Sequence, residues 1–250
     1  MPNPLTRGRR WRWLPLSPTA WVYLLLHLLL IAVGYMMVLA HTIEAVGASL
    51  IAAGITGIVV FVYIRFSQDT ADRLRIINDF GIVAAFEARA ARIKTEYDRR
   101  LLTAREIDVM GFGLNALRQD YREQFADWAQ RCRVRVLLVD PNYPDPRCSY
   151  ARQREDEEGD LAGSIGAQVK AFLLDTEPLR GAGARFEVRL YRSIPALNIC
   201  RIDNEIFWGP YLVGGPSRNN PTIIVRRGGI MFDKLLSHFN MVWEKWSNPA

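Results

Sequence analysis

Two long runs of apolar residues dominate the first quarter of the chain, over residues 20–40 and 46–64. The first run contains one polar residue, His27, and the second contains Ser49 and Thr56. Each run is about 20 residues long, which is the length that a helix needs to cross roughly 30 Å of hydrocarbon. A spanning helix also satisfies its own backbone hydrogen bonds, which lipid cannot do. We therefore expect the two runs to form a transmembrane helical hairpin.

A cleaved signal peptide is the alternative interpretation of the first run. Arginines precede the run, as in a signal peptide, but it is longer than the roughly 7–15 apolar residues of a signal core. A second apolar run also follows at once, with no small-residue cleavage site between the two. We favour the transmembrane interpretation.

Positive charge flanks the hairpin on both outer sides but is absent from the short connection at residues 41–45, which carries one acid. The positive-inside bias therefore predicts a multi-pass protein of a bacterial inner (cytoplasmic) membrane, with both termini in the cytoplasm. Small residues in the second run could pack either on the first run or on another copy. The flanking arginines are Arg7, Arg9, Arg10, Arg12, Arg65, Arg73 and Arg75, and the small residues are Gly47, Ala53, Gly54 and Gly57.

A polar segment with helical spacing of its apolar residues follows the hairpin, and after it strand-like and helix-like patterns alternate. This alternation predicts an α/β fold with a mixed sheet covered by helices. The expected segments are a basic cytoplasmic N-terminus (1–18), the hairpin (19–66), a linker helix (67–104) and a cytoplasmic α/β domain (105–250). Within the domain we expect strands at 106–112, 134–139, 186–192, 199–202, 205–208 and 222–226, and helices at 114–131, 155–174 and 230–246.

Four stretches of this domain resemble the phospholipase D superfamily, over roughly residues 81–246. The resemblance implies a phospholipase D-like mixed-sheet domain, of which two copies or halves usually make one site. The segments are AREIDVMGFGLNAL (104–117), RVRVLLVDP (133–141), IPALNICRIDNEIFWGPYL (194–212) and FDKLLSHFNMVWEKW (232–246).

The catalytic pair of that family is missing from this chain. The family pattern is His-x-Lys, four residues and then Asp, in which histidine attacks phosphorus and lysine neutralises phosphate charge. Alignment on Asp203 places Asn198 at the lysine position and Ala196 at the histidine position. No histidine of the chain is followed two residues later by lysine, so catalysis of the phospholipase D type by this chain alone is excluded. The histidines are His27, His41 and His238.

A degenerate domain of this family could still hold a phosphate-bearing group, either a nucleotide or a phospholipid headgroup. Glycine loops at 214–216 and 111–113 could bring backbone donors to an anion, although tight turns explain the same glycines. Asp203 is likewise a common turn residue. The candidate ligand-binding residues are Asn198, Arg201, Asp203, Ser217, Arg218, Asn219 and Asn220.

Other chemistry has little support in the sequence. Cys132, Cys148 and Cys200 are widely spaced, which argues against a zinc site, and in a cytoplasmic domain we expect them to be reduced. No Walker A motif and no Gly-x-Ser-x-Gly motif is present. The net charge of +6 is concentrated near the expected membrane, so it favours anionic lipid over nucleic acid. We expect no metal, no cofactor and no nucleic-acid partner.

Three functions remain open at this point. The leading hypothesis is a non-catalytic sensor or effector, anchored in the bilayer, whose domain binds a phosphate-bearing ligand or a partner. The rival is a membrane-bound phosphodiesterase or phosphatidyltransferase that uses a non-standard or partner-completed site, and the third is a protein-docking scaffold. Because a single half of the phospholipase D fold implies a second one, we expect a homodimer or a higher oligomer.

Overall fold

The computed structural model describes residues 18–41, 43–87, 91–181, 183–216 and 219–250, without the side chains at 68–70, 72–73 and 91–92. Contacts between residues divide the chain into two compact units, Met1–Leu74 and Arg75–Ala250, which are described separately. The fold is mixed α/β, with two apolar helices followed by an eight-stranded mixed sheet and its covering helices.

The first unit contains the helix α1 (Pro18–Leu39) and most of α2 (Glu44–Phe80). By length and composition, Pro18–Leu39 and the Glu44–Ser67 part of α2 are long and apolar enough to cross a membrane. The expected pair of apolar helices is therefore present, which makes association with a membrane plausible. Most apolar side chains of these two helices are exposed and not packed in a protein core. This exposure is expected if lipid surrounds the helices.

Glycines hold α1 and α2 in backbone contact. A Cβ atom added at Gly34 would lie 2.5 Å from the carbonyl oxygen of Gly47, and one added at Gly47 would lie 2.7 Å from that of Gly34. Further along, Gly54 receives the side chain of Ile31, and Gly57 receives the imidazole of His27. The glycines of the second run thus pack within the hairpin, as one of the two alternatives predicted.

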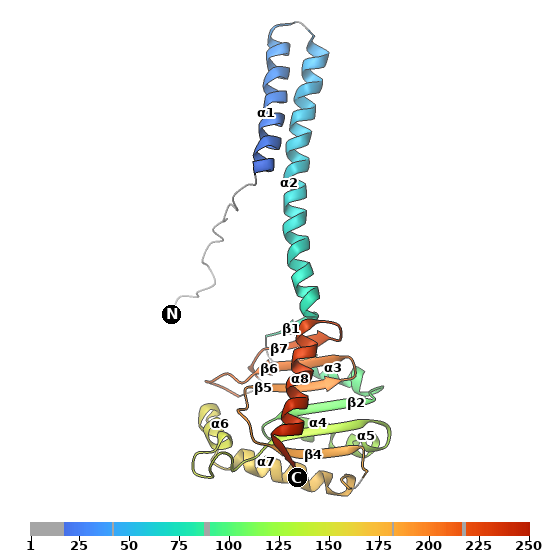
Figure 1. Cartoon of the computed structure of the whole chain (residues 1–250), viewed down its shortest axis with the longest axis vertical. Helices are drawn as coiled ribbons and strands as arrows, with labels where there is room; N and C mark the ends of the chain where they lie inside the picture. The colour runs from blue at the N-terminus through green and yellow to red at the C-terminus, as the bar shows by residue number, and fades with distance from the viewer. Residues whose placement is uncertain (1–17, 42, 88–90, 182, 217–218) are drawn as a thin grey trace. The chain divides into compact units, whose positions relative to one another are not determined.

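The second unit is built on a sheet with the strand order β1-β7-β6-β5-β2-β3-β4-β8 (Figure 1). The neighbours β2, β3 and β4 are parallel, and every other pair is antiparallel. The strands are β1 (Ile82–Phe86), β2 (Glu106–Gly111), β3 (Arg133–Val139), β4 (Phe186–Tyr191), β5 (Leu197–Ile202), β6 (Glu205–Pro210), β7 (Thr222–Arg226) and β8 (Ser247–Pro249). All six expected strands are confirmed, and β1 and β8 at the sheet's two edges were not expected.

Helices cover both faces of this sheet. Successive side chains of a strand point to opposite faces, and on β4 Arg189 packs on Trp243 of α8 whereas Phe186 packs on Phe125 of α5. Figure 1 shows α8 crossing the strands on the one face, with α4 and α5 on the other. The helices are α3 (Ala91–Leu101), α4 (Asn115–Tyr121), η2 (Arg122–Gln124), α5 (Phe125–Arg131), α6 (Tyr150–Glu158), α7 (Ser164–Thr176), η3 (Glu177–Leu179) and α8 (Ile230–Lys245).

The expected linker helix at 67–104 is not one helix. It comprises the end of α2, the strand β1 and the helix α3. Gly81 has a φ of +76°, a conformation that commonly ends helices because only glycine adopts it without strain. The five residues after it can pair with β7, and this tertiary pairing overrides their helical spacing.

Two expected helices are each divided. The segment 114–131 forms α4, η2 and α5, and the segment 155–174 belongs to α6 and α7. Gly159 and Gly163, both with positive φ, separate α6 from α7. The acidic run at 155–160 therefore lies largely in the last turns of α6, and it does not begin a helix as expected.

Candidate functional site

The parallel strands β2, β3 and β4 end at one edge of the sheet, and the antiparallel neighbours β5 and β7 begin there. We call this the carboxyl edge. In open α/β sheets, ligands bind outside the carboxyl ends of the strands. Of the residues chosen from the sequence, Asn198 is the second residue of β5 and Asn220 precedes β7, so the fold brings both to the carboxyl edge.

Two glycines make room for polar side chains at this edge. A Cβ atom at Gly111 would lie 3.0 Å from Oη of Tyr211, which accepts a hydrogen bond of 3.3 Å from the backbone N–H of Phe112. Gly209 pairs with Asn198, and its added Cβ would lie 3.4 Å from Nδ2 of that residue. We call these four residues at the carboxyl edge, Gly111, Gly209, Asn198 and Tyr211, the cradle.

The turn that follows β2 has an unusual backbone. Leu114 adopts φ 48° and ψ 31°, which is the left-handed region that non-glycine residues rarely occupy. Such strain, of order 1–3 kcal/mol, tends to concentrate at functional sites. Next to it, Gly113 lies against Gln168 of α7, where any side chain would collide. The β2–α4 turn is thus fixed tightly beside the cradle.

The remaining candidates near this edge differ in their environment. Asn220 is buried and donates a hydrogen bond of 3.2 Å from Nδ2 to the carbonyl oxygen of Pro210. Asn219 is exposed in the loop before β7. Ser217 and Arg218 lie outside the described residues. The half-buried side chain of Asn198 has no hydrogen-bond partner among the described residues, so it is the free donor and acceptor of the cradle.

Arg201 and Asp203 lie at the opposite end of β5. Asp203 is five positions after Asn198, which corresponds to about 16 Å at roughly 3.3 Å per residue. Asp203 has a φ of 50° in the β5–β6 turn, and its Oδ1 accepts hydrogen bonds from the backbone N–H groups of Arg105 (2.9 Å) and Glu106 (2.8 Å). Asp203 therefore fastens this turn to the start of β2, well away from the carboxyl edge.

Arg201 belongs to a buried charge network under α8. Its guanidinium donates to Asp108 on β2 (2.8 Å) and to Glu106, and Asp108 also accepts a bidentate pair from Arg135 on β3. The guanidinium of Arg135 lies 4.9 Å from the ring centroid of Phe239 on α8. Sequence analysis chose Arg201 but missed its partners in this network, Asp108 and Arg135. The two acids in β2 and the arginines in β3 could have indicated ion pairs between neighbouring strands.

Arg154 of α6 is a further residue that the sequence analysis missed. Its side chain is 2% exposed, pairs with Glu157 and Glu158, and donates to the carbonyl oxygens of Leu212 (2.9 Å) and Gly215 (3.4 Å). It also lies 5.3 Å from the ring centroid of Tyr211. Arg154 thus holds the β6–β7 loop in place at the carboxyl edge. The acidic run at residues 155–160 could have indicated that a basic side chain such as Arg154 pairs with it.

Tyr191, at the end of β4, is the most deeply buried polar group near this edge. Burial raises the pKa of its phenol well above the ordinary value, and nearby Tyr211 raises this pKa further. The Tyr191 hydroxyl finds no hydrogen-bond partner among the described residues. It therefore stays protonated at neutral pH.

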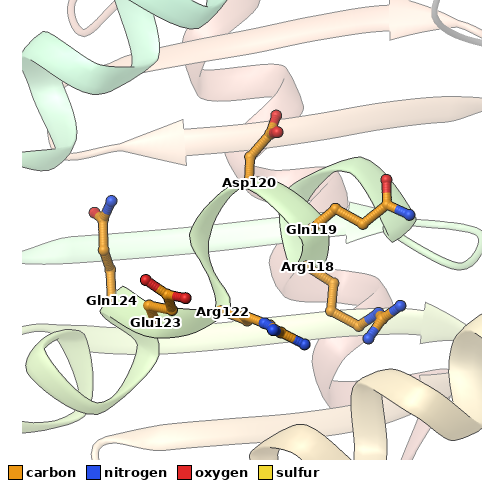
Figure 2. A pocket seen from close by; sticks show the side chains of 6 residues that line it. All are labelled: Arg118, Gln119, Asp120, Arg122, Glu123 and Gln124. Carbon is orange, nitrogen blue, oxygen red and sulfur yellow. The ribbon is translucent and has the colours of Figure 1, made fainter.

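A hollow of about 490 Å³ lies elsewhere, where α4 meets η2, and Figure 2 shows the six residues that line it. All six come from residues 118–124, and their side chains splay in different directions, with Asp120 pointing away from Arg118. Arg118 already donates to Asp175 (3.0 Å), and Asp120 pairs with Lys94 (3.6 Å). The hollow is a notch at the break between two helical segments, with no convergent set of donors.

Residues 75–250 contain one histidine, His238. It lies on α8, where burial lowers the pKa of its imidazole. Within the part of the chain that the structure describes, no group of three histidine, cysteine or acidic side chains is placed to hold a metal ion. The cradle therefore offers neutral hydrogen-bonding groups and no imidazole nucleophile.

The chain shows a distant likeness to solved structures. The chain is similar to TrmBL2, an archaeal chromatin protein, with 13% identity and a TM-score of 0.42 over 81% of this chain and 71% of that one. It is also similar to phosphatidylserine synthase of Haemophilus influenzae Rd KW20, with 12% identity and a TM-score of 0.44 over 66% of this chain. The chain spans 39% of that synthase.

Comparison with curated proteins finds no match. Residues 80–234, which contain the strands β1 to β7 and the carboxyl edge, match the family model described as "Domain of unknown function (DUF5919)". Because this match covers more than half of the chain, the protein belongs to the DUF5919 family.

Proposed function

We propose that the protein is a membrane-anchored, non-catalytic sensor or effector whose α/β domain binds a phosphate-bearing ligand at the carboxyl edge. The observation that carries the proposal is the cradle itself. The amide of Asn198 and the phenol of Tyr211 both lie at this edge, beside the strained β2–α4 turn. Neutral donors and backbone N–H groups are suited to an anion that is held and not attacked.

The absence of a nucleophile supports binding over turnover. Phosphoryl transfer through a covalent intermediate needs an activated side chain, and the only histidine of residues 75–250, His238, lies on α8. Asn198 at the position of the catalytic lysine is neutral, so it gives a phosphate a hydrogen bond without the charge that stabilises a transition state. In this proposal both termini are cytoplasmic, and the helices α1 and α2 span the inner membrane.

A test uses the full-length protein in nanodiscs. Titration calorimetry with inorganic phosphate, adenosine monophosphate and a short-chain phosphatidylglycerol compares a free phosphate, a nucleotide and a headgroup, and product formation is followed in the same samples. We expect saturable binding without turnover, weakened about 10- to 150-fold by Asn198→Ala, since a hydrogen bond to a charged group contributes about 1.5–3 kcal/mol. Gln119→Ala, at an exposed position on α4, is the matched control.

The outcomes separate the competing functions. Absence of binding for all three probes would refute the phosphate site. Turnover of a phosphodiester would replace the sensor by the rival, a phosphodiesterase or phosphatidyltransferase.

A second function, docking of a protein partner, is favoured by one observation. The loops at the carboxyl edge expose the aliphatic side chains of Ile194 (70%) and Val213 (75%), together with Leu212 (46%). Exposed apolar groups on neighbouring loops are typical of interaction surfaces. If ligand binding fails and Val213→Asp abolishes recruitment of a partner in cells, docking is the better description.

A further inference from the structure

The β6–β7 loop begins at Tyr211, whose phenol belongs to the cradle, and the loop is thinly packed beyond this residue. A Cβ atom added at Gly214 or Gly215 would meet nothing within 4 Å. In the described part of the loop, two carbonyl groups accept hydrogen bonds from outside it, those of Leu212 (2.9 Å) and Gly215 (3.4 Å). Arg154 of α6 donates both of these bonds. The position of the loop therefore depends on this guanidinium.

Arg154 is itself held in one orientation. Its side chain is 2% exposed and pairs with Glu157 (3.1 Å) and Glu158 (2.6 Å), which lie about one turn later on α6. A guanidinium donates its hydrogen bonds in a rigid planar fork, so several partners together fix its plane. The guanidinium carbon lies over the ring of Tyr211, 5.3 Å from the ring centroid. Arg154 thus contacts both the loop and the aromatic ring at which the loop begins.

The next residue of α6 connects this helix to the turn after β2. Glu155 is 2% exposed. Its carboxylate accepts hydrogen bonds of 2.7 Å from the backbone N–H groups of Gly163 and Ile165, at the start of α7. On α7, the side chain of Gln168 packs against Gly113 in the β2–α4 turn. The helix that carries Arg154 is therefore fixed, through α7, to the turn beside the cradle.

The phenol of Tyr211 returns to the same turn. Its oxygen accepts a hydrogen bond of 3.3 Å from the backbone N–H of Phe112, and the two rings meet edge-on with 4.8 Å between their centroids. We propose that Arg154 is a positioning residue of the ligand site, which holds the β6–β7 loop so that this phenol stays in place at the carboxyl edge. Tyr211 contacts the ligand, and Arg154 affects the affinity through Tyr211. This inference rests on the proposed function and adds a residue that controls the same site.

The first measurement needs no ligand. Amide hydrogen exchange at Phe112, resolved by mass spectrometry on the full-length protein in nanodiscs, reports the contact with the phenol of Tyr211. Arg154→Lys keeps the positive charge, but one ammonium group cannot replace the fork that binds two carbonyls and two acids together. We expect this variant to speed exchange at Phe112 by roughly threefold or more, as local opening does. The matched control is Arg118→Lys, which alters an arginine of α4 that pairs with Asp175 of α7 (3.0 Å), and it should leave this exchange unchanged.

A double-mutant cycle on ligand affinity gives the second readout. The probes are inorganic phosphate, adenosine monophosphate and the short-chain phosphatidylglycerol. Tyr211→Phe removes the phenol oxygen and should weaken binding by about tenfold or more, whereas Arg154→Lys alone should weaken it by roughly threefold or more. In the Tyr211→Phe background Arg154→Lys should have no further effect, because two residues that act through one contact are not additive. Glu158→Gln, which releases one side of the guanidinium, should act in the same direction and replaces Arg154→Lys if that variant does not fold.

The outcomes distinguish this inference from the function on which it rests. Additive losses of affinity in the double variant would overturn the positioning role, as would unchanged exchange at Phe112 in Arg154→Lys. A wild-type protein that binds none of the three probes would refute the proposed function, and the positioning role with it, whatever the exchange at Phe112.

Discussion

Asp108 on β2 and Arg201 on β5 are direct partners in the antiparallel register of their strands, and they form a buried ion pair with a length of 2.8 Å. Their side chains are 1% and 4% exposed. On the other side, Asp108 is the register partner of Arg135, whose guanidinium it also binds. One carboxylate therefore joins three neighbouring strands at the centre of the sheet.

Removal of this carboxylate should destabilise the domain strongly. Asp108→Ala leaves two buried guanidinium groups without their shared partner, a change that typically costs 3–5 kcal/mol. Urea unfolding of the detergent-solubilised protein measures this free energy. The control is Asp127→Ala, which removes a partly exposed pair with Arg131 and should cost less than about 1 kcal/mol. Equal effects of the two substitutions would contradict the central role of Asp108.

The close contact between Gly81, which follows α2, and Gly229, which precedes α8, should be sensitive to a single added methyl group. Gly229, at the start of α8, lies against Gly81, where a Cβ atom on Gly229 would collide with backbone atoms of Gly81 and lie 2.7 Å from the carbonyl oxygen of Phe80. Gly229→Ala should therefore cost about 1–3 kcal/mol of unfolding free energy, as overpacking does. Gly215→Ala has nothing within 4 Å of the new atom and serves as the control. If the two variants unfold alike, the close approach of Gly81 and Gly229 is not needed for stability.

The strands of this fold could be predicted because their patterns are local. The buried run at residues 134–139 and the alternation at 186–192 each determine which side chains enter the core. The turn at Asp203 likewise has a local signal, since Asp and Asn tolerate the left-handed conformation. β1 could not be predicted in this way, because Ile82–Phe86 is a strand only through its pairing with β7, more than 130 residues later.

The positions of the candidate site residues could also be predicted only where the signal is local. Asn198 was chosen from the alignment of one short motif, and the fold places it at the carboxyl edge. Arg201 was chosen because arginine suits phosphate, but its buried partners come from β2, a strand about 93 residues earlier in the chain. Sequence spacing within one segment cannot show that a distant carboxylate already occupies a guanidinium.

Acid should weaken the contact between α3 and β6. The hydrogen bond from Arg100 is the main cause that lowers the pKa of Glu96 below its ordinary 4.5, and Arg100 also pairs with Glu205. A lowered carboxyl pKa in the folded state stabilises the protein above the unfolded pKa, and this contribution is lost as pH falls through the folded pKa. The unfolding free energy of the wild type should therefore exceed that of Glu96→Gln at pH 7, with the difference shrinking below pH 4.5. An exposed site, Glu123→Gln, should show no such difference, and a constant gap down to pH 3 would contradict the role of ionised Glu96.

A positive charge at position 198 should convert the cradle into a tighter anion site without creating an enzyme. Asn198→Lys places an ammonium group at the carboxyl edge, where a bound phosphate gains Coulomb attraction. We expect inorganic phosphate to bind at least fivefold more tightly, with a gain that declines between 50 and 500 mM salt because mobile ions screen the new charge. No turnover of a phosphodiester should follow, since lysine neutralises charge but the nucleophilic imidazole is still missing from this edge.

Gln119→Lys adds the same charge on α4, away from the cradle, and should leave the affinity unchanged. Equal gains for both lysine variants would show that net charge and not the cradle determines binding, and turnover by Asn198→Lys would show that a nucleophile other than histidine lies within reach.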